Sequence, residues 1–232
     1  MTMTSTSRTN DFVALISHEL RTPLSSIIGY LELVRDDDDG ELSTSQLQYL
    51  AVAERNAHRL LRLVGDLLFT AQVESGAFQL EQVPVQLQPI LAASLESISP
   101  IASTAGVILR ADFPQSATVN GDPVRLAQAV DNLMSNAVKF TPRGGIVTLS
   151  LATTDDSGVI SVGDTGMGIA AAELDKLFSR FFRASTALNN AVPGVGLGLT
   201  ITKAIVTAHH GVMGVHSTEG KGTTFSMTLP LA

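Results

Sequence analysis

The sequence predicts an α+β protein in which a helical hairpin is followed by an α/β sandwich domain. Up to residue 76 the apolar residues recur every three or four positions, which is the period of a helix with one buried face. From residue 77 onward short β-like runs alternate with helical stretches, a pattern typical of a sheet packed against helices. The 232 residues therefore divide into two predicted domains, 1–76 and 77–232.

The hairpin is predicted from two helical series of apolar residues that are separated by a charged break. The first series is Val13, Ile16, Leu20, Leu24, Ile27, Leu31 and Val34. The aspartates at 36–39 and Gly40 then disfavour a continuing helix, and Ser43 with Gln46 reads as a capping box that starts the second helix. Its series is Leu47, Leu50, Ala57, Leu61, Val64, Leu68 and Ala71, with Glu54 in one seam position.

Two antiparallel helices of roughly 28 residues each cannot bury a two-sided seam alone, and such hairpins commonly pair into four-helix bundles. We therefore expect a homodimer in which two hairpins form a four-helix bundle. The alternative is that the seam packs against the rest of this chain.

The second domain is predicted from strands and helices that follow one another closely. The expected strands are Val107–Leu109, Ile146–Leu151, Val159–Val162, Gly214–His216 and Thr223–Leu229. The expected helices are Leu87–Ser99, Val124–Lys139, Ala171–Phe178 and Leu199–Ala208. Strands interleaved with helices, several of them adjacent in sequence, indicate an α+β domain.

The composition excludes several classes of protein and site. The chain has no cysteine, so it has no disulfide, thiol nucleophile or thiolate zinc site. Its 22 acidic and 15 basic residues give a net charge of −7, and it has no tryptophan, so we expect no nucleic-acid partner. No uncharged apolar run approaches the roughly 20 residues of a membrane-spanning helix. His209 and His210 end a predicted helix, where a charged imidazole interacts favourably with the helix dipole.

His18 is the first candidate for chemistry, because it faces away from the seam of its helix. Ile16 and Leu20 lie on the seam, and at about 100° per residue each lies about 200° from His18. Taken alone, such a residue is more often a solvated surface histidine than a reactive one. The residues that follow it favour chemistry.

Glu19, Thr22 and Pro23 follow His18 within two turns of the predicted helix. Pro23 should kink the helix, which is costly unless the distortion has a use. A neutral imidazole is a competent phosphoryl acceptor, and the Glu19 carboxylate can hold its tautomer and accept the ring proton. The Thr22 hydroxyl, one turn on, can orient a water molecule against a phosphohistidine.

Residues 17–24 resemble the H-box of bacterial sensor histidine kinases, in the group with a Glu-x-x-Thr motif after the histidine. The resemblance implies that His18 is the phosphorylated residue and that Glu19 is the general acid or base. It also implies that Glu19 and Thr22 together support phosphatase activity on the partner protein.

A predicted helix in the second domain carries Asn132, Asn136 and Lys139 on one face, at spacings of four and three. Two asparagines on a buried helix face can simply satisfy each other. Carboxamide oxygens are also suitable ligands for Mg²⁺, which keeps water and phosphate oxygens in its shell, and a lysine one turn on can meet a phosphate.

Two glycine-containing motifs follow this helix. Asp-x-Gly-x-Gly at 164–168 comes after a predicted strand, where a carboxylate can accept a hydrogen bond from an exocyclic amine; a plain turn explains the segment equally well. Gly-x-Gly-x-Gly at 194–198 precedes a predicted helix, where backbone N–H groups can approach phosphates. Its spacing matches neither the dinucleotide-binding fingerprint nor the P-loop.

The asparagine helix, the two glycine motifs and the phenylalanines between them resemble the N, G1, F and G2 boxes of the Bergerat ATP-binding fold, which histidine kinases share with gyrase and MutL. The F-box residues are Phe178, Phe181 and Phe182. The resemblance implies a catalytic ATP-binding domain with ATP and Mg²⁺ as cofactors. It implies that Asn136 coordinates Mg²⁺, that Asn132 assists at the metal and phosphates, and that Lys139 contacts a phosphate.

The resemblance also implies which residues contact the two ends of the nucleotide. The adenine side is assigned to Asp164, Gly166 and Gly168. The phosphate side is assigned to Gly194, Gly196 and Gly198. Residues 183–195 would form a mobile lid. Thr165 replaces the asparagine of many relatives, and Pro193 stands where the lid usually has another glycine, which we expect to stiffen the lid and slow nucleotide exchange.

The sequence thus predicts the catalytic core of a sensor histidine kinase, which autophosphorylates His18 and passes the phosphoryl group to an aspartate of a response regulator receiver domain. The alternative is a phosphatase-dominant or nucleotide-sensing signalling protein with weak kinase activity. A different Bergerat ATPase would leave the H-box unexplained, and a structural dimerisation module would leave the nucleotide motifs unexplained. We expect a cytoplasmic location, with membrane contact only through a sensor region absent from this chain.

Overall fold

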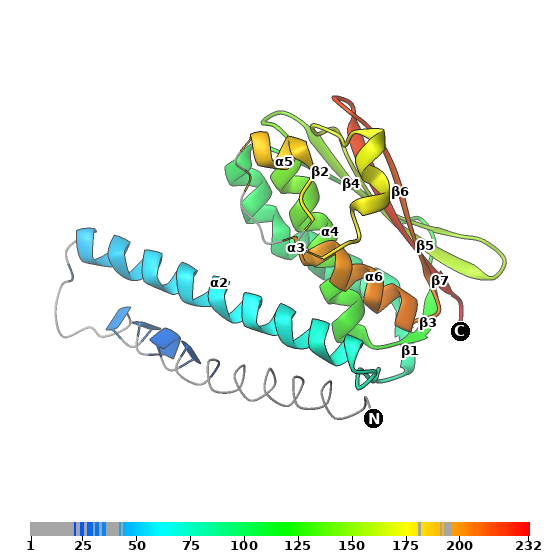
Figure 1. The fold of residues 1–232 in the computed structure, drawn as a ribbon, viewed down its shortest axis with the longest axis horizontal. Coiled ribbons are helices and arrows are strands. Elements are labelled where there is room, and N and C mark those ends of the chain that lie inside the picture. The colour runs from blue at the N-terminus through cyan, green and yellow to red at the C-terminus, as the bar shows by residue number, and fades with distance from the viewer. Residues whose placement is uncertain are drawn as a thin grey trace, which may run out of the picture. The chain divides into compact units, whose positions relative to one another are not determined.

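The computed structural model describes residues 21, 24–25, 27–29, 31–32, 34–35, 42, 44–180, 182–190, 192 and 196–232. The chain forms two compact units, Met1–Gln79 and Leu80–Ala232. The first unit is helical, and the second combines strands with helices (Figure 1). The α+β organisation that the sequence predicts is therefore confirmed.

The first unit is a helical hairpin. The described residues before position 36 are helical, and helix α2 (Thr44–Glu74) follows them. Leu24 and Ile28 are buried together with Ala57, and Leu61 packs against this cluster. The two helices therefore contact each other through apolar residues at helical spacing. Leu24, Ala57 and Leu61 belong to the predicted seam, whereas Ile28 does not.

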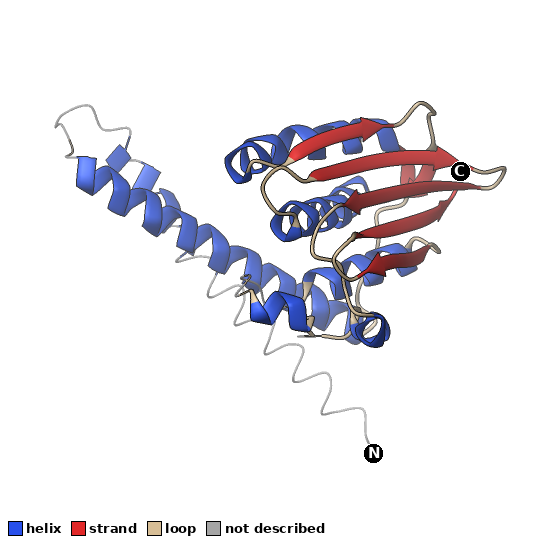
Figure 2. Cartoon of the chain, turned by 90° about the horizontal axis from the view of Figure 1, so that it is seen from above, coloured by secondary structure: helices blue, strands red, loops and turns tan. Residues whose placement is uncertain are grey.

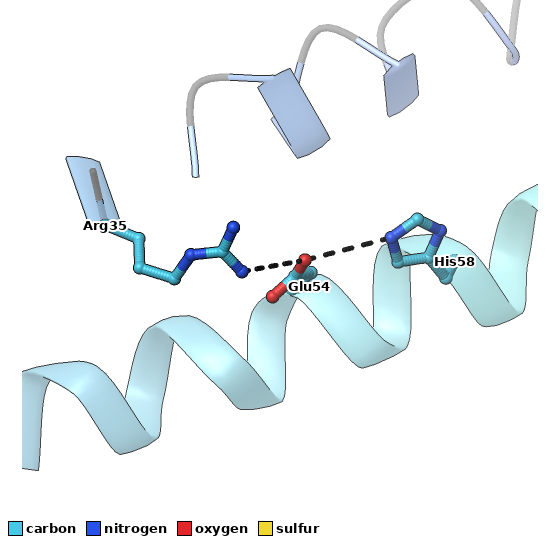
Figure 3. Close-up of polar contacts among 3 residues, drawn as sticks. All are labelled: Arg35, Glu54 and His58. Atoms are coloured by element: carbon cyan, nitrogen blue, oxygen red, sulfur yellow. Dashed lines mark ion pairs between the residues drawn. The ribbon is translucent and has the colours of Figure 1, made fainter. Parts of the chain in front are cut away.

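A charged residue, Glu54, occupies one position of the predicted apolar seam of α2. Its Oε1 atom lies 3.7 Å from Nη1 of Arg35, which comes from the segment before α2, and 4.0 Å from Nε2 of His58 (Figure 3). A surface ion pair of this kind contributes at most about 1 kcal/mol. Its main effect is to give the seam carboxylate a partner across the hairpin.

Several large apolar residues of the hairpin are exposed within one chain: Ile27, Val34, Leu47, Tyr49, Val52, Leu60 and Leu67. Of those on α2, Tyr49, Leu60 and Leu67 lie at helical spacings that place them on one face, which forms an uncovered apolar surface. Ile27, Val34 and Leu47 belong to the predicted seam and are exposed in a single chain, as expected of a two-sided seam that one hairpin cannot bury alone. Extended exposed apolar surfaces mark interaction sites.

The second unit contains a five-stranded sheet in the order β2-β4-β5-β7-β6 (Figure 2). The strands are β2 (Ile108–Asp112), β4 (Ile146–Thr153), β5 (Ser157–Asp164), β6 (Val212–Thr218) and β7 (Gly222–Pro230). Strands β2 and β4 are parallel, and the other neighbours are antiparallel. Strand β5 is the middle strand, so both of its edges are paired.

Three helices cover one face of this sheet (Figure 1): α3 (Leu87–Ala105), α4 (Pro123–Phe140) and α6 (Gly198–Ala208). Alternate residues of the strands point toward the helices and are buried, as the two-residue period of a strand requires. The largest fully buried side chains are Leu87, Leu91, Leu126, Leu133, Met134, Leu149, Leu151, Ile160, Ile201, Ile205, Met227 and Leu229.

Several elements differ from the prediction. Helix α3 runs through Pro100 and ends where Gly106 adopts a left-handed conformation, whereas the sequence predicts an end at Ser99. The predicted helix at 171–178 is the shorter 3₁₀ helix η1 (Ala171–Lys176). The sequence analysis missed the antiparallel pair β1 (Val83–Gln86) and β3 (Thr118–Gly121), and the short helix α5 (Ser185–Asn189).

Candidate functional site

Helix α4 is positioned at its start by Asp122. The Asp122 carboxylate accepts hydrogen bonds from the backbone N–H of Val124 at 3.0 Å and of Arg125 at 3.1 Å. Pro123 occupies the first turn, where a helix does not need the N–H that proline lacks. The apolar face of α4 is buried in the core, so its opposite face is left for polar side chains.

That polar face carries Asn132, Asn136 and Lys139, each half-buried. The Asn132 side-chain Nδ2 lies 3.5 Å from the carbonyl oxygen of Gly198, at the start of α6. The Lys139 ammonium lies 5.1 Å from the centre of the Phe140 ring. Within the described part of the chain the Asn136 carboxamide makes no hydrogen bond, which leaves its oxygen available as a ligand.

Asp164 ends the middle strand β5 with a carboxylate held by two backbone donors. Its Oδ1 atom accepts hydrogen bonds from the N–H of Gly166 at 2.8 Å and of Thr223 at 3.3 Å. Burial raises the pKa of Asp164 above its usual value, and these two hydrogen bonds oppose that rise. The second carboxylate oxygen accepts no hydrogen bond from the described residues, so it can accept one from a ligand.

The loop after Asp164 requires glycine at two positions. A Cβ on Gly166 would overlap the carbonyl oxygen of Phe140, and a Cβ on Gly168 would overlap that of Thr218. Gly168 also has a φ of +63°, a left-handed conformation that favours glycine. The N–H of Met167 donates to the Phe140 carbonyl at 3.3 Å, which places this loop against the last residue of α4.

The third motif leads into α6. Gly196 has a φ of +80°, and Gly198 is the first residue of the helix. The Gly198 carbonyl accepts a hydrogen bond from the Thr202 hydroxyl at 2.9 Å, in addition to its long contact with Asn132. The N-terminus of α6 therefore lies beside the polar face of α4, and a helix N-terminus favours anions.

Phe178 anchors the segment that follows η1. Its ring makes an edge contact with the Phe225 ring, with centroids 6.5 Å apart, and the Lys203 ammonium lies 5.1 Å from its centre. The Thr200 hydroxyl donates to the Phe178 carbonyl at 3.2 Å. Phe178 is thus held by both α6 and β7. Phe182 is half-buried, and Phe181 lies outside the described residues.

Helix α5 lies in the predicted lid and is attached to two other segments. Glu173 of η1 accepts hydrogen bonds from the Ser185 N–H at 2.9 Å and from its hydroxyl at 3.1 Å. The Thr186 hydroxyl donates to the Gly168 carbonyl at 3.4 Å. The described part of the lid therefore contacts the same glycine loop that follows Asp164.

The structure thus joins the predicted motifs of the second unit: Asn132 with Gly198, the end of α4 with the loop at 165–168, and that loop with α5. The predicted residues His18, Glu19, Thr22 and Gly194 lie outside the described residues. The sequence analysis missed Thr223, whose N–H contacts Asp164, because only the pairing of β5 with β7 brings the two together.

The arrangement suits a nucleoside triphosphate. A carboxylate beside a glycine loop can accept a hydrogen bond from a base amine, while a helix N-terminus, a lysine and a carboxamide oxygen can meet phosphates and a cation. Within the described residues no group of three or more histidine and acidic side chains is placed to hold a metal ion.

Two family models match the chain. Residues 8–76 match the His Kinase A (phospho-acceptor) domain. Residues 121–232 match the family described as histidine kinase-, DNA gyrase B- and HSP90-like ATPase. The two matches fall in the two compact units of the structure.

Curated relatives cover nearly all of this chain. The circadian input-output histidine kinase CikA of Thermosynechococcus vestitus is 38% identical over 224 residues, which is 95% of this chain and 31% of the relative. The sensor histidine kinase WalK of Bacillus subtilis is 34% identical over 224 residues, 95% of this chain and 36% of the relative. The chain thus spans about a third of the length of these relatives.

Solved structures are similar to most or nearly all of this chain. Full-length ShkA in complex with AMPPNP has a TM-score of 0.78 and 32% identity, over 96% of this chain and 46% of that one. The mycobacterial sensor histidine kinase MprB has a TM-score of 0.60 and 32% identity, over 64% of this chain and 98% of that one. In the described portion of the present chain, no helix has the length and apolar character needed to span a membrane. The chain belongs to the bacterial two-component sensor histidine kinases and contains their phosphoacceptor and ATP-binding domains.

Proposed function

We propose that this protein transfers the γ-phosphoryl group of ATP to a ring nitrogen of His18 and then passes it to an aspartate of a response regulator. One observation carries the proposal. The same chain holds a phosphoacceptor domain at 8–76 and an ATPase domain at 121–232, and in the latter the asparagine helix contacts both glycine motifs. We place the boundary between the two functional parts after residue 76.

In this proposal the second unit binds ATP through the residues described above. The free oxygen of Asp164 accepts a hydrogen bond from the adenine amine. Gly166 and Gly168 have no side chain, so the backbone can approach the base. The phosphates lie against the glycines that precede α6, at positions 194, 196 and 198, where the helix N-terminus favours negative charge. Lys139 contacts a phosphate from the end of α4.

Asn136 fits a magnesium ligand, because its carboxamide is half-buried on the same face as Lys139 and makes no hydrogen bond with the residues that the structure describes. Asn132 is placed to assist, although its Nδ2 atom also contacts Gly198. Bound Mg²⁺ would neutralise phosphate charge that develops during transfer. Positioning and charge neutralisation then supply most of the rate.

The first transfer forms a phosphorus–nitrogen bond and breaks the bond between the γ-phosphorus and the bridging oxygen. A lone pair of the neutral His18 ring attacks, ADP leaves with the bridging oxygen, and Glu19 accepts the ring proton. The phosphoramidate then donates its phosphoryl group to the aspartate of the regulator. In a separate phosphatase reaction that ends the signal, Thr22 and Glu19 support hydrolysis of the phosphorylated regulator.

We further propose that two copies of the chain associate through their hairpins. The support is the uncovered apolar surface of α2, on which Tyr49 is 73% exposed and Leu60 and Leu67 are each 46% exposed. Burying such side chains contributes roughly 1.5–3 kcal/mol each. We place the reaction in the cytoplasm, where ATP is available.

The decisive test is incubation of the chain with γ-labelled ATP and Mg²⁺. The parent is compared with His18→Ala and Asn136→Ala, and with two matched controls, His58→Ala and Asn56→Ala, which change an exposed histidine and an exposed asparagine of α2. We expect acid-labile, base-stable label on the parent and both controls, and none on His18→Ala or Asn136→Ala. Label that persists in His18→Ala would contradict the assignment of the phosphoacceptor.

A further inference from the structure

Helices α4 and α6 lie side by side and contact each other at both ends of their interface. At the nucleotide end, Asn132 Nδ2 lies 3.5 Å from the Gly198 carbonyl oxygen, which is long for a hydrogen bond. At the other end, the backbone N–H of Asp122 donates to Nε2 of His209 at 2.9 Å. The stronger polar contact between the two elements is therefore the one remote from the nucleotide.

The His209 ring is neutral and has a defined tautomer. The Asp122 N–H can only donate, so Nε2 must be the unprotonated acceptor. Nδ1 therefore carries the hydrogen and donates it to the Ile205 carbonyl, 2.8 Å away on the last turn of α6. The ring is 4% exposed. The interpretation of His209 as a charged residue at a helix C-terminus is thus wrong.

The surroundings of the ring show that this contact is closely fitted. A Cβ on Gly121 would overlap Cδ2 and Nε2 of His209, so only glycine at 121 lets the ring reach Asp122. The Asp122 carboxylate in turn caps α4 through Val124 and Arg125. One imidazole thus connects the end of α6 to the residue that begins α4.

We infer that His209 is a positioning residue of the nucleotide site: by accepting the Asp122 N–H, it fixes α6 along α4 and so sets the separation of Gly198 from the Asn132 face. This inference rests on the proposed role of these helices in binding ATP. Among the described residues, the contacts of His209 and Asn132 both bear on the register of the two helices, and loss of His209 removes the shorter of them, while apolar packing allows sliding.

The test compares His209→Leu, which removes the acceptor, with His209→Gln, which returns an acceptor oxygen near the position of Nε2. His216→Leu, at an exposed histidine of β6, is the matched control. Affinity for ATP in Mg²⁺ and autophosphorylation kinetics are measured at a temperature at which thermal melts show every variant folded. We expect His209→Leu to raise Kd and KM for ATP about tenfold with little change in kcat, and the glutamine variant to restore most of the affinity.

The outcomes separate this inference from the proposed function. A parent chain that does not bind ATP overturns both, whereas a parent that binds ATP with a folded His209→Leu of equal affinity overturns only the role of His209. Should His209→Leu not fold, ¹⁵N spectroscopy of the parent decides: a proton on Nε2 of His209 overturns the inference. An unprotonated Nε2 that receives the Asp122 N–H, together with rescue by His209→Gln, supports it.

Discussion

The Oδ1 atom of Asp164 accepts a hydrogen bond from the backbone N–H of Gly166 at 2.8 Å. Because the donor belongs to the loop that turns away from β5, this bond orients the carboxylate at the strand end. One oxygen is thereby fixed by the protein, and the other is left for a ligand. The first two predictions follow from this division between the two oxygens.

Asp164→Asn should weaken ATP binding at least about tenfold at neutral pH, because the amide either gives up the bonds to Gly166 and Thr223 or presents an N–H donor to the adenine amine. Calorimetric titration with ATP and Mg²⁺ measures the change. Asp156→Asn is the matched control, since that carboxylate lies in an exposed turn. Equal affinities for the parent and Asp164→Asn would exclude Asp164 from base recognition.

The affinity for ATP should fall on acidification at a higher pH than an ordinary aspartate would dictate. Burial raises the pKa of Asp164 above its usual value. Protonation places a hydrogen on the oxygen that is not bonded to Gly166 and Thr223, so this oxygen becomes a donor and no longer accepts from the adenine amine. For the same reason the group's contribution to the free energy of unfolding is present below pH 3.8 and is lost as the pH rises through the raised folded-state pKa. Titrations with ATP from pH 4 to 8 should show the fall in affinity for the parent and not for Asp164→Asn.

Gly168→Ala should damage the site more than Gly144→Ala, although both glycines have positive φ, +63° and +84°. At Gly144 a Cβ meets no atom within 4 Å, so the cost is only the backbone strain of about 1–2 kcal/mol. At Gly168 the Cβ overlaps the Thr218 carbonyl, so the loop must move as well. We expect ATP binding to be lost in Gly168→Ala and kept in Gly144→Ala, as measured by fluorescent-nucleotide titration; the reverse order would contradict the geometry.

Replacing Leu60 and Leu67 together with glutamine should weaken the dimer at least about hundredfold, because each buried leucine contributes roughly 1.5–3 kcal/mol. Sedimentation equilibrium gives the dimer dissociation constant directly. Val212→Gln, which changes an even more exposed apolar residue of β6, should leave the constant unchanged. A double variant that stays as dimeric as the parent would show that this face of α2 is not the interface.

Most of the regular elements were predictable from local pattern. Strands β4, β5 and β7 bury every second residue over most of their length, and Asp122 and Pro123 are typical residues for the start of a helix such as α4. The failures have local causes. Strands β1 and β3 have four residues each, too few to show a period, and Pro100 resembles a helix end although α3 continues to Gly106.

The apolar pattern of the hairpin does not determine which of its residues pack between the two helices of one chain. Leu24 and Ile28 are buried together with Ala57, although Ile28 is not one of the predicted seam residues. Ile27 and Leu47, which are predicted seam residues of the two helices, are exposed. A period distinguishes the polar side of a helix from its apolar side. It does not say which apolar residue faces which of two neighbours.

In the nucleotide site, residue types were predictable and contacts were not. Asn132, Asn136 and Asp164 stood out because their chemistry is uncommon at such spacings. Thr223 contributes only a backbone N–H, and its pairing with Asp164 follows from strand register, 59 residues away. The position of His209 at the end of a helix was predictable, but its neutral state depends on a hydrogen bond from Asp122, 87 residues away in the sequence.

The position of Asp164 at the end of the middle strand has a consequence for how the protein opens. Strand β5 is paired on both edges, with β4 and β7, so its amides exchange with solvent only when the sheet itself comes apart. Helix α5 has five residues and is attached through side chains such as Glu173, so it can detach in a far smaller fluctuation. In the proposed nucleotide site, α5 can therefore detach while the strand that carries Asp164 stays folded.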